Sequence, residues 1–206
     1  MPNAVRIIRI PGTPTVPLRK LKTFGIHDLF GRANNPASLG TSDDNKTWLA
    51  WRGVWGILDG AAYVSDLSAN GQKIAVAQSY ASDGRIEAQF SAIDAAGDGS
   101  AGIILRGQDI NNHLIANNAG GGKLRLWKRV NGAAVAIADG PAAVGIIGSG
   151  DVLSVEMNGP SIRVYKNGGL AIDVANAPEF AAATLHGPAL NAAGTRVTRF
   201  DFTAAV

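Results

Sequence analysis

Residues 151–174 constrain the fold most, because apolar and polar residues alternate there in three short segments. A period of two is typical of strands with one buried face. Asn-Gly pairs at 158–159 and 167–168 separate the segments, and this dipeptide tolerates the positive φ of tight reversals between antiparallel strands. The stretch therefore predicts a three-stranded meander, with these residues on its buried faces: Leu153, Val155, Met157, Ile162, Val164, Leu170, Ile172 and Val174.

The same period predicts strands in the middle of the chain. Ile86, Ala88 and Phe90 alternate with polar residues and are expected to face the core. The continuous apolar run 101–105 predicts a central strand covered on both faces, with residues 113–116 paired beside it. A chain of 206 residues with this pattern is expected to be all-β: two antiparallel sheets that form a sandwich over residues 23–206.

Residues 1–22 differ in composition from the predicted sandwich. They hold five basic and no acidic residues, whereas the remainder holds 14 basic and 16 acidic residues. Prolines at 11, 14 and 17 favour an extended backbone. A solvated tail seldom carries three isoleucines, so we expect this basic arm to dock on a neighbouring subunit; a frayed N-terminus is the alternative. The docking residues are expected to be Arg6, Ile7, Ile8, Arg9 and Ile10.

Composition also excludes several classes of protein. Cysteine is absent, which excludes disulfides, thiol nucleophiles and cysteine-based zinc sites. The uncharged apolar runs are shorter than the roughly 18 residues that a membrane span needs. No secretory signal is visible, so the sequence predicts a protein made in a cytoplasm, without membrane insertion. The basic excess lies in the arm, which argues against a nucleic-acid binder.

Several short motifs resemble a known family. They are Asp28-x-Phe30-x-Arg32-Ala33, Leu39-Gly40, Trp48, Gly-x-Trp-Gly-Ile at 53–57 and Ala62-Tyr63, followed by segments at 101–106, 151–156, 162–168 and 198–202. Over residues 24–203 the chain is similar to the concanavalin A-like (laminin-G-like) jelly-roll domains of minor tail proteins from siphophages that infect actinobacteria.

This resemblance implies a jelly roll in which residues 24–30 lie beside the terminal strand at 195–202. It also implies a structural or adhesive component of a virion. As a minor tail protein the chain would be made in the host cytoplasm, assemble with other tail proteins and with copies of itself, and contact host surface polysaccharide. A free carbohydrate-binding module is the second hypothesis, and a glycan hydrolase is the third.

The residues themselves argue against an enzyme. Glycoside hydrolysis needs two carboxyl groups that flank the bond. In jelly-roll glucanases they come from a Glu-x-Asp-x-Glu run, but none of the three glutamates, Glu87, Glu156 and Glu179, has a carboxylate two positions away. The three histidines are scattered along the chain. We therefore expect no catalytic residues and no enzyme.

A candidate ligand surface lies around residues 106–113 and on the predicted strand 123–130. Leu124 and Leu126 are expected to face the core, so Trp127 points away from it. An outward Trp beside amide and charged groups is typical of sites that hold sugar rings, although cover by a loop, by the arm or by another subunit is the alternative. The predicted glycan contacts are Arg106, Asp109, Asn111, Asn112, His113, Arg125, Trp127 and Arg129.

We expect no cofactor and no metal ligands in this chain. Asp94 and Asp98 lie four residues apart in a glycine loop, where bound calcium is the alternative to a solvated acidic loop. Trp48, Trp51 and Trp55 are expected to fill one end of the sandwich as core side chains.

Overall fold

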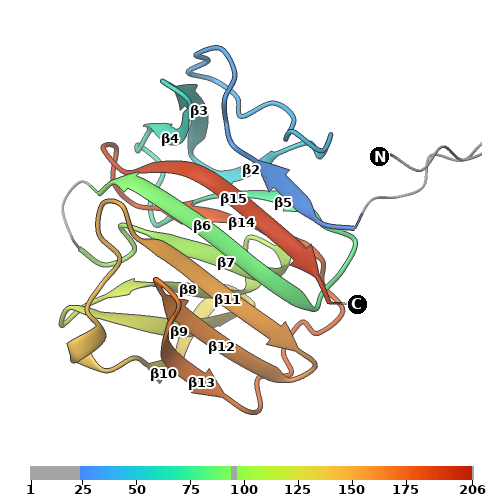
Figure 1. The fold of residues 1–206 in the computed structure, drawn as a ribbon, viewed down its shortest axis with the longest axis vertical. Coiled ribbons are helices and arrows are strands. Elements are labelled where there is room, and N and C mark those ends of the chain that lie inside the picture. Colours follow the sequence, from blue (N-terminus) through green and yellow to red (C-terminus); the bar gives the residue numbers. More distant parts are fainter. Residues whose placement is uncertain (1–23, 94–96, 206) are drawn as a thin grey trace, which may run out of the picture.

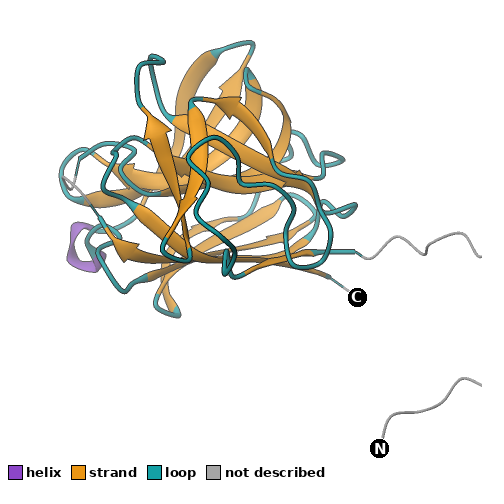
Figure 2. Cartoon of the chain, turned by 90° about the horizontal axis from the view of Figure 1, so that it is seen from above, coloured by secondary structure: helices purple, strands orange, loops and turns teal. Residues whose placement is uncertain are grey.

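The computed structural model describes residues 24–93 and 97–205, and it confirms the predicted jelly-roll sandwich of two antiparallel sheets (Figures 1 and 2). Its helical content in these residues is one 3₁₀ turn, η1 (Ala142–Val144). None of the helices in the described part of the chain has the length and hydrophobicity needed to cross a membrane. The predicted arm, with its docking residues, lies outside the described residues.

The first sheet has eight strands. Its main path runs in the order β13-β12-β11-β6-β15-β4-β3, and β1 pairs with β15. The strands are β1 (Ile26–Asp28), β3 (Val54–Leu58), β4 (Ala61–Asp66), β6 (Gly84–Ala92), β11 (Val152–Asn158), β12 (Ser161–Lys166), β13 (Gly169–Val174) and β15 (Arg196–Ala204).

The second sheet has seven strands in the order β10-β9-β8-β7-β14-β5-β2. They are β2 (Leu49–Arg52), β5 (Lys73–Gln78), β7 (Gly102–Asp109), β8 (Asn112–Ala119), β9 (Lys123–Val130), β10 (Ala133–Asp139) and β14 (Leu185–Leu190). The predicted central strand is β7, which lies between β8 and β14.

The predicted meander is β11-β12-β13, joined at the two Asn-Gly turns. The prediction that Leu170 faces the core is wrong. A register shift between Val164 and Tyr165 sets Tyr165 opposite Leu170 and Val164 opposite Ile172. Leu170 is therefore about half exposed, whereas Ile172 is buried. A bulge of this kind turns the residues before it to the opposite face of the strand.

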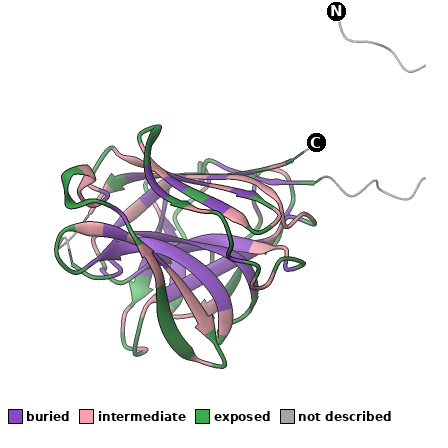
Figure 3. Cartoon of the chain, turned by 90° about the horizontal axis from the view of Figure 1, so that it is seen from below, coloured by how far each residue is buried: buried purple, intermediate pink, exposed green. Residues whose placement is uncertain are grey.

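The pairing expected between residues 24–30 and the terminal strand is also present. Ile26 lies opposite Phe202, and Asp28 lies opposite Phe200, in the antiparallel pair β1 and β15. Both phenylalanines are buried in the main core. This core fills the space between the two sheets and includes the predicted residues Ile86, Ala88 and Phe90, as the buried strand segments in Figure 3 indicate.

The first motif of the family resemblance forms an internal network. Asp28 is fully buried, and its carboxylate accepts two hydrogen bonds from the Arg32 guanidinium, at 2.7 and 2.8 Å. It also accepts one from Trp48 Nε1 at 2.6 Å and one from the backbone N–H of Phe30 at 2.8 Å. These residues therefore maintain the fold and do not form a ligand site.

The three clustered tryptophans divide between two environments. Trp48 and Trp55 are buried in the main core, as predicted. Trp51 is not, because it packs on a separate apolar cluster and lies against Gly107. The prediction that all three tryptophans fill one end of the core is wrong for Trp51.

Candidate functional site

A second apolar cluster lies on the outer face of the seven-stranded sheet. Successive side chains of β7 point to opposite faces, so Ile103 joins the main core whereas Ile104 faces outward. The outward cluster consists of Ile74, Val76, Ile104, Ile115 and Ala189, with Trp51, Ile110, Trp127 and Leu185 partly buried against it. These five side chains are buried beneath the residues around them, so the outer face of this sheet carries a small apolar core of its own.

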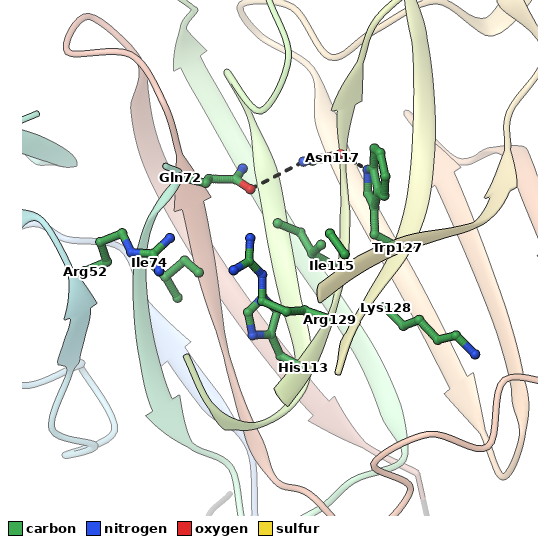
Figure 4. Close-up of a pocket in the computed structure, with 10 residues that line it drawn as sticks. Arg52, Gln72, Ile74, His113, Ile115, Asn117, Trp127, Lys128 and Arg129 are labelled. Atoms are coloured by element: carbon green, nitrogen blue, oxygen red, sulfur yellow. Dashed lines mark hydrogen bonds between the residues drawn. The ribbon is translucent and has the colours of Figure 1, made fainter. Parts of the chain in front are cut away.

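Two residues of this cluster, Ile74 and Ile115, form the apolar floor of a cleft of about 150 Å³ (Figure 4). We call it the Trp127 cleft. Its walls come from β2, β5, β8, β9 and β10, which lie apart in the sequence. The lining residues are Arg52, Gln72, Ile74, His113, Ile115, Asn117, Trp127, Lys128, Arg129 and Ala134.

Trp127 is held in place by a row of amide hydrogen bonds. Its indole Nε1 donates to Asn117 Oδ1 at 3.0 Å, and Asn117 Nδ2 donates to Gln72 Oε1 at 3.4 Å. Gln72 Nε2 in turn donates to the carbonyls of Gly99 and Ala189. The row fixes the indole beside Ile115 at the edge of the cleft, as Figure 4 shows.

Arg125 covers one face of the Trp127 ring. Its guanidinium lies 4.7 Å from the ring centroid and is fixed by a two-pronged ion pair with Asp139. Asp139 also pairs with Lys123, and these cations hold the pKa of the Asp139 carboxyl well below its ordinary value. Arg125 thus occupies one face of the ring, and the partly exposed indole lines the cleft.

His113 is buried at the bottom of the cleft. Its Nδ1 lies 3.2 Å from the backbone carbonyl of Asp109, which makes Nδ1 the donor nitrogen. Burial above all, together with repulsion from Arg129 and Arg52, lowers the pKa of His113 to about 4. The imidazole is therefore neutral at pH 7, and Nε2 is left as an acceptor.

Two arginines from different strands point into the cleft. Arg52 comes from β2 and Arg129 from β9, and Figure 4 shows their guanidinium groups reaching toward each other over the apolar floor. Burial, and then repulsion from Arg129, lowers the pKa of Arg52. Lys128 differs from both, because its ammonium group points away from the cleft and pairs with Glu179.

Three of the predicted contact residues lie at the turn between β7 and β8, since Asp109 ends β7, Asn111 is in the turn and Asn112 begins β8. Asp109 accepts hydrogen bonds from the Asn111 backbone and from the Asn112 amide. Asn112 Oδ1 accepts from the backbone N–H of Asn131, which ties this turn to the β9–β10 turn. The side chains of Asp109 and Asn112 thus have structural partners, and none of the three residues lines the Trp127 cleft.

Arg106 is not available to a glycan. Its side chain is fully buried and donates to Asp83, at 2.6 Å, and to the carbonyl of Gly159, at 2.5 Å. A bulge in β7 places Arg106 at φ 47°, and the side chain points into the interior beside the β11–β12 turn. The expectation that Arg106 contacts a glycan is wrong, since the bulge reverses the face that simple alternation assigns to it.

The cleft thus unites three predicted residues, His113, Trp127 and Arg129, with Arg125 directly behind Trp127. Sequence reasoning missed Asn117, although it follows His113 and Ile115 at a spacing of two, which places all three on one face of β8. It also missed Arg52 and Gln72. Those residues reach the cleft only through the pairing of β5 with β14 and β2, which no local pattern encodes.

The structure describes only part of the predicted calcium loop, since Asp94 lies outside the described residues. Asp98 is described, and its carboxylate lies close to Gly120. No group of three or more histidine, aspartate or glutamate side chains suited to a metal ion is found in residues 24–93 and 97–205.

Comparison with known proteins shows the fold of this chain. No family model matches it, and no curated protein matches it. Among solved structures, it is similar to a β-glucanase from Bacillus licheniformis, with a TM-score of 0.58 and 11% identity over 88% of this chain and 99% of that one. It is also similar to the carbohydrate binding module CBM66 from Bacillus subtilis, with a TM-score of 0.55 and 20% identity over 74% of this chain and 91% of the module. A third similar structure is the apo Crh5 transglycosylase, with a TM-score of 0.54 and 11% identity over 88% and 85% of the two chains.

The fold of these neighbours is the concanavalin A-like jelly roll, and this chain has the same fold. They also correct one expectation. A β-glucanase and a transglycosylase have this fold, which contradicts the prediction that the chain is not an enzyme. Carbohydrate-binding modules and glycan-processing enzymes share the architecture, and the comparisons bring no support for a phage tail protein.

Proposed function

We propose that this chain binds carbohydrate in the Trp127 cleft. The observation that carries the proposal is the fixed indole of Trp127 beside an apolar floor and a row of amide groups. Sugar rings present C–H groups that pack on indole and aliphatic surfaces, and hydroxyls that exchange hydrogen bonds with amides. The fold supports the proposal, because a carbohydrate binding module and glycan-processing enzymes have the same jelly-roll fold.

The volume of the cleft limits how much of a glycan it holds. Its volume of about 150 Å³ is below the roughly 300 to 1,000 Å³ of ordinary ligand pockets, so we expect it to hold no more than one sugar residue, and a longer chain to extend over the outer face of the sheet. At the cleft wall, His113 Nε2 provides an acceptor and Asn117 Nδ2 provides its second N–H as a donor. We expect weak binding to one residue and tighter binding to an oligosaccharide that covers more of the sheet.

The proposal is tested by measuring glycan binding with the full chain and with Trp127→Ala. We expect the substitution to lower glycan affinity by about tenfold or more, since stacking and the fixed indole edge are both lost. Leu170→Ala is the matched control, because Leu170 is an exposed apolar residue of the other sheet. Equal affinity of the wild-type chain and the Trp127 variant would overturn the assignment of the cleft.

Release of reducing ends is measured in the same experiment, since enzymes share this fold. Glycoside hydrolysis generally uses two carboxyl groups. The described residues that line the Trp127 cleft include no aspartate or glutamate. Glycan cleavage that disappears in the Trp127 variant would extend the proposal from binding to catalysis at this cleft.

The role in a siphophage tail is a second proposal and rests on the sequence resemblance alone. It includes assembly with other tail proteins and with copies of this chain, through Arg6, Ile7, Ile8, Arg9 and Ile10. The test is to delete residues 1–22 from this protein and to measure whether the shortened protein is incorporated into virions. Normal incorporation of the shortened protein would show that the arm is dispensable, and absence of the full-length protein from virions would reject the role.

A further inference from the structure

Arg52 and Arg129 differ from the other described arginines in having no partner. Six arginines form ion pairs with aspartate or glutamate. A seventh, Arg196, donates to backbone carbonyls. Within residues 24–93 and 97–205, the Arg52 and Arg129 side chains form neither an ion pair nor a hydrogen bond. Both of them line the Trp127 cleft.

This arrangement leaves two cations in one cleft without a compensating charge. The described lining residues include no carboxylate, and the one further cation, Lys128, already pairs with Glu179. The low pKa of Arg52 and the low pKa of His113 both reflect burial together with repulsion from Arg129. Bringing an anion between the two guanidinium groups would replace this repulsion with attraction.

We propose that the Trp127 cleft selects saccharides that carry acidic groups. This inference rests on the proposed carbohydrate function and names its ligand class. Arg52 and Arg129 would donate to a carboxylate, sulfate or phosphate group of the sugar, while Trp127 and the isoleucine floor contact its ring. A guanidinium is suited to this role, because its planar set of N–H donors matches the oxygens of such groups in pairs.

The neutral state of His113 agrees with this assignment. A charged imidazole would add a third cation to the cleft, whereas a neutral one offers Nε2 to a sugar hydroxyl without altering the charge. The charged groups around His113 are Arg52 from β2, Arg129 from β9 and Asp109 from the β7–β8 turn. Selection of the acidic group therefore falls to the two arginines.

The test compares acidic and neutral saccharides of the same length on the full chain. Oligogalacturonate and the corresponding neutral galactose oligosaccharide are a suitable pair. We expect the acidic ligand to bind about tenfold or more tightly, and its affinity to fall as salt is raised. Arg52→Gln and Arg129→Gln should each remove most of this preference, which is measured as the ratio of the acidic to the neutral affinity of the same variant.

Arg163→Gln is the matched control. It removes the same charge from an exposed arginine of the eight-stranded sheet, and the preference should persist. The melting temperature of each variant confirms that it is folded, and Arg129→Lys keeps the charge but loses the planar fork. Arg129→Lys should show an intermediate preference, because the charge remains while the paired hydrogen bonds are lost.

The outcomes separate this inference from the proposed function. If neutral and acidic saccharides bind equally well, or if the preference survives both glutamine variants, the inference fails while carbohydrate binding stands. If no saccharide binds, both fail.

Sulfated and phosphorylated galactose oligosaccharides, tested beside the carboxylate, show which acidic group is preferred. Inorganic phosphate as a competitor shows whether the sugar ring is needed, and full competition at equal concentration would reject a saccharide ligand.

Discussion

Asp28 shows how a single buried charge is compensated in this fold. All four of its hydrogen bonds come from Phe30 and Arg32, in the loop that follows β1, and from Trp48. Desolvation of a carboxylate costs several kcal/mol unless charge and hydrogen bonds replace its water. Here the Arg32 guanidinium provides the charge, and the Trp48 indole links the network to Phe30 and Phe200 in the core.

Replacing Asp28 should therefore destabilise the protein strongly. Asp28→Ala leaves the Trp48 N–H without its acceptor and the Arg32 guanidinium with the Leu39 carbonyl alone, and we expect a loss of about 3 to 5 kcal/mol in the free energy of unfolding. Urea unfolding followed by tryptophan fluorescence measures it. Asp173→Ala is the control, because it breaks an exposed pair with Arg163 and should have little effect. Equal effects of the two substitutions would contradict this account of the network.

His186 is a second buried titratable group with defined partners. Its Nε2 lies 3.1 Å from the carbonyl of Ala81, and its Nδ1 lies 3.2 Å from the backbone N–H of Arg106. Nδ1 must therefore be the acceptor, and the neutral ring stacks on Phe202 at 4.4 Å. Burial above all, with repulsion from the Arg106 side chain, lowers the pKa of His186 to about 4.

This shift makes stability depend on pH. The unfolded chain takes up a proton on His186 below its ordinary pKa of 6.5, whereas the folded chain does so only near pH 4. The contribution is therefore complete above about pH 6.5 and is lost as pH falls toward 4, on the order of 3 kcal/mol in all. Urea unfolding at several pH values checks it. His186→Gln should reduce the slope over this range, to which His113 also contributes, and an unchanged slope would contradict the assignment.

At the scale of an element, β13 shows how a bulge reassigns the faces of a strand. The register shift in its pairing with β12 buries Ile172 and Ala171 and exposes Leu170. Ile172→Ala should therefore cost about 2 to 4 kcal/mol of unfolding free energy. Leu170→Ala on the same strand should cost far less, since its side chain is already half in water. Equal costs in urea unfolding would show that the strand has the unshifted register.

The elements differ in how far their sequence determines them. The meander and the face of β9 were predictable, because Asn-Gly turns and the alternation around Leu124 and Leu126 are local signals. The bulge at Arg106 was not, since it depends on the pairing of β7 with both β8 and β14. A positive φ at an arginine has no sequence signature, and it moved Arg106 from the predicted glycan surface into the interior.

At the scale of the whole molecule, the order of strands in the seven-stranded sheet assembles the cleft. Strands β8 and β9 are neighbours in sequence, and they bring His113, Asn117, Trp127 and Arg129 together. Arg52 arrives from β2 at the far edge, across β5, β14 and β7. Half of the candidate site could thus be predicted from one hairpin, whereas the other half required the long-range topology of the jelly roll.

The most direct test of the central claim is an amide and indole NMR spectrum of the full chain during titration with an oligosaccharide. The account predicts that the Trp127 indole N–H signal moves together with the Asn117 side-chain amide, since both line the cleft. The Trp48 indole signal should stay in place, because it donates to Asp28 in the core. A Trp127 signal that stays in place would contradict carbohydrate binding in this cleft. That holds if resonances of β12 and β13 move instead, and it holds if no resonance moves.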